Sequence, residues 1–122
     1  GPKGQSVDVV AHELMHAEIH HRVGYLKRFL QLPTWFDEGV AMQVDYRTRY
    51  SLSPQDSQTA DYVRDLTTFS SFFKGDEQAV VRNYASAKQV VASWLSKVGT
   101  TSLYMHLQRL KNGESFDEIV TE

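Results

Sequence analysis

Apolar residues recur at every third or fourth position along most of the chain, a spacing that predicts helices. The clearest row has six members and is ended by Gly99: Val80, Tyr84, Ala87, Val91, Trp94 and Val98. A shorter row consists of Leu103, Leu107 and Leu110 and ends at residues 112–113. These rows predict one long and one short amphipathic helix. With the rest of the pattern they favour a mainly α fold with little or no sheet.

Capping residues predict two further helices in the first half of the chain. The first spans residues 6–24 and begins at Ser6, a favourable N-cap residue. The second spans residues 33–46, and near its start Thr34 and Asp37 have the spacing of a capping box. The two segments are joined by a short stretch, so an antiparallel pairing is expected.

The remaining segments predict shorter elements. Residues 51–57 are polar and predict a loop, residues 61–73 predict one helix or two short ones, and residues 74–76 break the pattern. Ser115, with Glu118 three residues later, predicts the cap of a last helix.

Composition predicts a single folded domain. Of the 122 residues, 41% are hydrophobic and 23% are charged, which suffices for one core. We expect this domain to cover residues 1–122, with residues 1–4 as a tag remnant or linker.

Charge and the lack of cysteine narrow the function classes. Thirteen basic and fifteen acidic residues give a net charge of -2, without the basic stripe of a protein that binds nucleic acid or an anionic membrane. No apolar run approaches the ~18 residues of a membrane-spanning helix. Because the chain has no cysteine, any metal must be bound by histidine and carboxylate side chains.

The first predicted helix contains the motif H-E-x-x-H, formed by residues 12–16. Residues four apart share one helix face, so His12 and His16 can bind one ion through both imidazoles. Glu13 then lies beside the ion without binding it and can accept a proton from water. The alternative is that both histidines are ordinary core or surface residues.

A third ligand is needed, and the remaining histidines are poor candidates. His20 lies eight residues from His12, which is ~12 Å along a helix and too far for one tetrahedral ion. With His21 it is better explained as a favourable charge at the helix C-terminus. His106 stands alone on a leucine-rich helix and is expected to be structural or exposed. Glu38 is the better candidate, because the second helix can bring it back over the first.

The segment Trp35-Phe36-Asp37-Glu38-Gly39, read together with H-E-x-x-H, resembles the gluzincins, the metallopeptidases with two histidines and a downstream glutamate as zinc ligands. The pattern is most similar to the bacterial peptidase MA-like family, with its P-x-W-F-x-E-G segment. The likeness extends over roughly residues 7 to 120. It implies a zincin-like helical core in which a metal helix is followed by a glutamate helix, and it suggests an extracytoplasmic bacterial protein.

The resemblance also implies roles for individual residues. His12, His16 and Glu38 would bind Zn²⁺. Glu13 would be the general base in the hydrolysis of a peptide or protein substrate, acting as an endopeptidase. Tyr84 would hydrogen-bond the oxyanion, although its place in an apolar row equally fits a core tyrosine.

Some alternatives remain open. Gluzincins generally bind substrate along an edge strand before the metal helix, and only about six residues precede it here. A catalytically silent, zinc-stabilised binding or regulatory module is therefore the second hypothesis, and a metal-free helical interaction domain is the third. Asp37 and Asp45 are candidates to orient the two imidazoles, or are helix-cap or exposed carboxylates.

Overall fold

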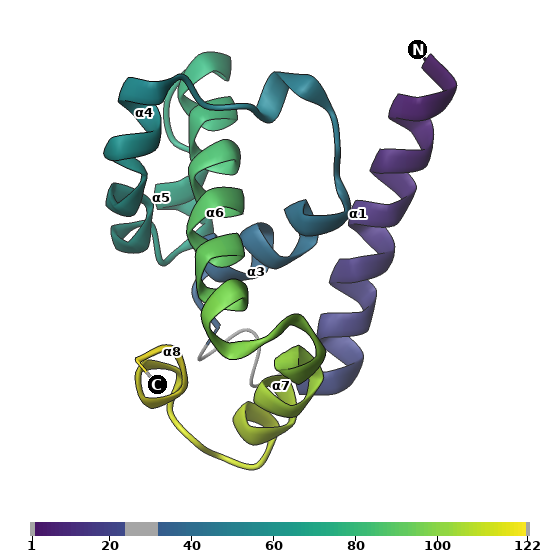
Figure 1. The fold of residues 1–122 in the computed structure, drawn as a ribbon, viewed down its shortest axis with the longest axis vertical. Coiled ribbons are helices and arrows are strands. Elements are labelled where there is room, and N and C mark those ends of the chain that lie inside the picture. The colour runs from purple at the N-terminus through teal and green to yellow at the C-terminus, as the bar shows by residue number, and fades with distance from the viewer. Residues whose placement is uncertain (1, 24–31, 122) are drawn as a thin grey trace.

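A computed structural model describes residues 2–23 and 32–121, and every regular element in them is a helix or a short 3₁₀ turn (Figure 1). The prediction of a mainly α fold is confirmed, since these residues form no sheet. The α-helices are α1 (Pro2–Val23), α3 (Thr34–Ala41), α4 (Pro54–Gln58), α5 (Phe69–Phe72), α6 (Glu77–Val98), α7 (Leu103–Lys111) and α8 (Phe116–Val120).

The short helix α3 connects the two long helices of the molecule. It lies across the space between α1 and α6 and contacts both (Figure 1). The expected antiparallel pairing of the first two helices is therefore replaced by a crossing. Helix α7 packs against the C-terminal end of α1. Helices α4 and α5 lie on the side of α6 that is opposite to α1 (Figure 1).

The long helix α6 has the boundaries that its apolar row predicts. Its N-terminus is capped by the Asp76 side chain, which accepts a hydrogen bond of 2.8 Å from the backbone N–H of Ala79. It ends at Gly99, whose φ of 92° is in the region that favours glycine. The 74–76 break is also confirmed.

Two predicted helix starts are wrong. Helix α1 begins at Pro2, so Ser6 lies inside the helix and does not cap it. Proline is well accommodated in a first helical turn, where its missing N–H costs no hydrogen bond. Helix α3 starts without any side-chain cap, and the capping box of Thr34 and Asp37 is not formed. Beyond Ala41 the chain tightens into the 3₁₀ turn η1 (Met42–Val44).

The shorter elements partly follow the sequence prediction. The predicted 51–57 loop contains helix α4, whose N-terminus is capped by Ser53 and which has Pro54 in its first turn, a pattern of good helix-start residues. The 61–73 segment holds two short elements, η3 (Ala60–Asp65) and α5, as one of the two alternatives predicts. Ser115 caps α8 by accepting a hydrogen bond from the N–H of Glu118.

An aromatic cluster fixes α3 against the C-terminal half of the chain. The Phe36 ring, 2% exposed, lies 4.9 Å from the Phe116 ring and 5.4 Å from the Trp94 ring, measured between centroids. Trp35 also packs on Phe116. Because these bulky rings hold α3 in one position, the polar residues that follow them have a fixed place in the molecule.

Gly39 is the point of closest approach between α3 and α6. A Cβ atom at this position would lie 2.4 Å from Cγ2 of Val91 and 2.6 Å from the carbonyl oxygen of Ala87. Any larger residue would push the helices apart. The glycine that follows Glu38 therefore lets α3 pack tightly on α6.

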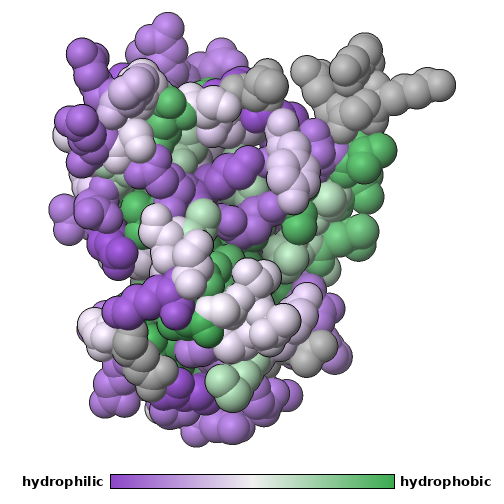
Figure 2. Space-filling view, in the orientation of Figure 1, coloured by the Kyte–Doolittle hydropathy of each residue, from purple (hydrophilic) through white to green (hydrophobic). Residues whose placement is uncertain are grey.

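The outer face of α1 is apolar and exposed. Val7, Val10 and Leu14 are 67%, 56% and 64% exposed, and apolar surface is visible along this helix in Figure 2. The opposite face carries His12 and Ile19, which are buried. Within the described residues, no helix combines the length and the apolar character needed to cross a membrane.

Candidate metal centre

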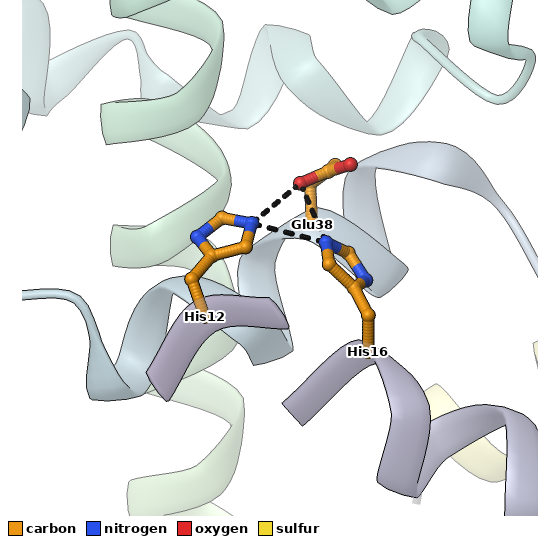
Figure 3. Close-up of side chains that lie close together, drawn as sticks. All are labelled: His12, His16 and Glu38. Carbon is orange, nitrogen blue, oxygen red and sulfur yellow. Dashed lines mark hydrogen bonds and ion pairs between the residues drawn. The ribbon is translucent and has the colours of Figure 1, made fainter. Parts of the chain in front are cut away.

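Three side-chain atoms from two helices meet at one point (Figure 3). Nε2 of His12 lies 3.0 Å from Nε2 of His16, and each of these nitrogens lies 3.2 Å from Oε2 of Glu38. The three atoms thus form a nearly equilateral triangle. All three residues are buried or half-buried. They could hold a metal ion, and they are the three ligands that the sequence predicts.

Local structure explains how the triangle forms. His12 and His16 are one helical turn apart on α1, so their rings lie above one another with centroids 4.8 Å apart. Glu38 reaches them from α3, which the aromatic cluster of Trp35 and Phe36 anchors in the core. The triangle of donor atoms therefore depends both on residue spacing along α1 and on the packing of α3 in the core.

A carboxylate contacts the far side of each imidazole. Oδ2 of Asp45 lies 3.2 Å from Nδ1 of His12, and Oδ1 of Asp37 lies 3.0 Å from Nδ1 of His16. Both aspartates are buried, and these contacts place their carboxylates where they can orient the imidazoles, as one of the two alternatives predicts. Carboxylates accept hydrogen bonds, so each Nδ1 carries the proton and donates it. Each Nε2 then presents a lone pair to the triangle.

When both imidazoles are neutral, this arrangement brings acceptor atoms together with no donor between them. Two Nε2 lone pairs and a carboxylate oxygen repel one another unless a positive charge lies among them. A proton or a metal cation can supply that charge, and a metal cation can bind all three atoms at once. The geometry is therefore one that could hold a cation.

The pKa shifts show the same preference for positive charge. Burial alone would raise the pKa of Glu38, but hydrogen bonds from His12 and His16 outweigh it and lower that pKa to about 2. Burial alone would lower the pKa of His16, but its hydrogen bonds to Asp37 and Glu38 raise it to about 10. The field that holds a proton on His16 also attracts a metal cation.

The two predicted catalytic residues lie beside this centre. Glu13 follows His12 directly and is exposed. The Tyr84 ring, on α6, makes an edge contact with the His12 ring at 6.0 Å between centroids. Burial, followed by the charges of Glu38, Tyr50 and Glu13 in that order, raises the pKa of Tyr84. Tyr84 also packs on Phe72, so it occupies both the edge of the core and the edge of the site.

The two other histidines whose side chains the structure describes, His21 and His106, do not join the centre. His106 is buried, its Nδ1 lies 2.7 Å from the carbonyl oxygen of Ser102, and its ring packs on Trp94. The structural role expected for it is confirmed. His21 is exposed in the last turn of α1, and the His20 side chain lies outside the described residues.

Sequence reasoning missed one residue near the centre, Arg47. Its guanidinium binds both carboxylate oxygens of Asp45, with Nη2 2.5 Å from Oδ2 and Nε 2.9 Å from Oδ1. Hydrogen bonds from Arg47 overcome the effect of burial and lower the pKa of Asp45. The only sequence signal was an arginine two residues after an aspartate, which is a common pair.

Comparison of the chain with protein-family models, with curated proteins and with solved structures gave no match. The functional interpretation therefore rests on the residues and the geometry of the centre.

Proposed function

We propose that the protein is a zinc-dependent metallopeptidase of gluzincin type that cleaves bonds within a peptide or protein substrate. The observation that carries this proposal is the convergence of two imidazole Nε2 atoms and one carboxylate oxygen, with a second glutamate next to the first histidine. This donor set with an adjacent base is suited to hydrolysis.

The residues fit zinc. Zinc bound at about 2.0–2.1 Å in tetrahedral geometry places neighbouring ligand atoms about 3.3 Å apart. The three donor atoms here are 3.0–3.2 Å apart, so a small adjustment of side chains accommodates that ion. Two histidines and one glutamate are also a ligand set of catalytic zinc, where three protein ligands leave one position for water or substrate.

Zinc held by these residues would supply a Lewis acid that polarises the peptide carbonyl and makes water acidic enough to react at neutral pH. Glu13 would accept a proton from the attacking water and return it to the leaving amine. Its exposure allows contact with water and substrate. A binding site alone would not need a carboxylate at this position.

Tyr84 would stabilise the negative charge that develops on the carbonyl oxygen of the substrate. Its raised pKa keeps the phenol protonated at neutral pH, so that it can donate a hydrogen bond. Its ring contact with His12 supports a place near the reacting carbonyl.

The test combines metal content with the Glu13→Gln substitution. We expect one zinc ion per chain after zinc loading, and hydrolysis of casein or of a peptide library by the unchanged protein. Glu13→Gln should bind zinc equally well and lose nearly all activity, whereas Glu18→Gln, on the same helix, should retain it. Equal activity of Glu13→Gln and the unchanged protein would disprove the mechanism.

The same experiment tests the second hypothesis of a zinc-stabilised binding module. That module would bind zinc tightly and become more stable, but it would hydrolyse no peptide. No binding of zinc at all would eliminate both hypotheses.

A further inference from the structure

The side chains around His12 form a closed circuit of contacts. His12 contacts Asp45 through Nδ1, and Asp45 is bound by Arg47. The Arg47 guanidinium lies 4.8 Å from the centre of the Tyr50 ring. The circuit closes through Tyr84, whose ring lies 5.5 Å from Tyr50 and 6.0 Å from His12.

We infer that Arg47 is a positioning residue of the metal centre, which holds Asp45 against His12 and supports Tyr84 through Tyr50. This inference rests on the proposed function, because it concerns the same zinc site. Arg47 contacts neither the candidate ligand atoms nor the general base, so it acts through its neighbours.

The surroundings of Asp45 make Arg47 necessary. The Asp45 side chain is fully buried, and a buried carboxylate is costly without a paired charge. Its oxygens accept hydrogen bonds from His12 and from both the backbone and the guanidinium of Arg47. Lys88 donates a hydrogen bond to the backbone carbonyl of Asp45. Arg47 therefore holds the carboxylate, and Lys88 holds the backbone.

The guanidinium of Arg47 makes two contacts, one with the Asp45 carboxylate and one with the Tyr50 ring, and both depend on the shape of arginine. The planar guanidinium can bind two carboxylate oxygens at once and stack on an aromatic ring. Lysine keeps the charge but cannot do both. Arg47→Lys is therefore not a conservative change at this position.

Arg49 provides a matched control within the same segment. Its guanidinium also lies over the Tyr50 ring, at 5.3 Å, and it also pairs with a carboxylate, that of Glu77. The Glu77 side chain is exposed and belongs to no part of the centre. The two arginines therefore differ in whether their carboxylate partner contacts His12, and Arg47 is also the more buried, with its side chain 20% exposed against 48% for Arg49.

The experiment measures Zn²⁺ affinity by competition with a chromophoric chelator and records the absorption spectrum of the Co²⁺-loaded protein. We expect Arg47→Met to weaken zinc affinity about tenfold and to change the cobalt spectrum, as loss of an outer partner of a metal ligand does. Arg47→Lys should recover only part of the loss, while Arg49→Met should behave like the unchanged protein. Thermal unfolding of each metal-free variant identifies any general loss of stability.

A double-mutant cycle with Asp45→Asn tests the route of the effect. If Arg47 acts through Asp45, the two losses in affinity will be far from additive. Additive losses, or an unchanged affinity and cobalt spectrum in Arg47→Met, would overturn the inference and leave the proposed function intact. Failure of the unchanged protein to bind zinc would overturn the proposed function and this inference with it.

Discussion

Asp37 and His16 are joined by a hydrogen bond of 3.0 Å on the side of the imidazole that faces away from the candidate metal centre. The next residue, Glu38, lies 3.2 Å from the other ring nitrogen of His16. Two consecutive residues of α3 thus hold one imidazole from both sides. A small shift of α3 would disturb both contacts together.

We predict that Asp37→Ala weakens zinc binding about 10- to 100-fold, because His16 loses the partner that fixes its tautomer and orientation. Asp37→Asn should lose less zinc affinity, because its amide oxygen can still accept a hydrogen bond from the Nδ1–H of His16. Zinc affinity by chelator competition measures both effects, and Asp65→Ala, at an exposed position, is the control. Full affinity in Asp37→Ala would show that the carboxylate does not orient the ring.

Removal of the metal should lower the thermal stability strongly. A ligand present at a thousand times its dissociation constant stabilises the folded state by about 4 kcal/mol. For a chain of this size that corresponds to about 10 °C or more in melting temperature. Thermal unfolding with excess zinc and with a chelator measures the difference. His16→Asn should melt at the same temperature in both conditions, and equal melting of the unchanged protein would exclude a metal centre that stabilises the fold.

Gly39→Ala should affect both the fold and the centre. The added Cβ would meet Val91 and the backbone of Ala87, and a helix backbone cannot move aside alone. We expect a loss of about 1–3 kcal/mol in unfolding free energy and weaker zinc binding, since Glu38 moves with α3. Chemical denaturation and chelator competition provide the two measurements. Ser96→Ala, exposed on α6, should change neither, and a stable Gly39→Ala with full zinc affinity would contradict the tight crossing.

The convergence of the three candidate metal ligands could be predicted from the sequence, because their geometry is local or depends on a short connection. His12 and His16 are fixed by the helical repeat alone, and Glu38 follows two aromatic residues that must enter the core. The long row of apolar residues in α6 likewise fixes that helix before any tertiary contact is considered.

The sequence-based predictions are wrong or incomplete where a side chain has more than one partner available. Asp37 has the spacing of a capping residue, but its carboxylate is used by His16, a partner 21 residues away. The role proposed for Arg47 depends on the burial of Asp45 and on the crossing of α1 and α3, neither of which is visible in the sequence. Capping signals such as Ser6 express a local preference of about 1 kcal/mol, which neighbouring helical turns can override.

Tyr84→Phe separates the two interpretations of Tyr84. Phenylalanine keeps the ring that packs on Phe72 and Tyr50, so folding and zinc affinity should be nearly unchanged. Loss of a hydrogen-bond donor to a developing oxyanion costs about a hundredfold or more in kcat. We therefore expect kcat for a peptide substrate to fall by that factor, with little change in KM. The raised pKa of Tyr84 implies that its contribution persists across the neutral pH range, because the phenol stays protonated. Activity within twofold of the unchanged protein, at equal zinc content, would assign Tyr84 to the core alone.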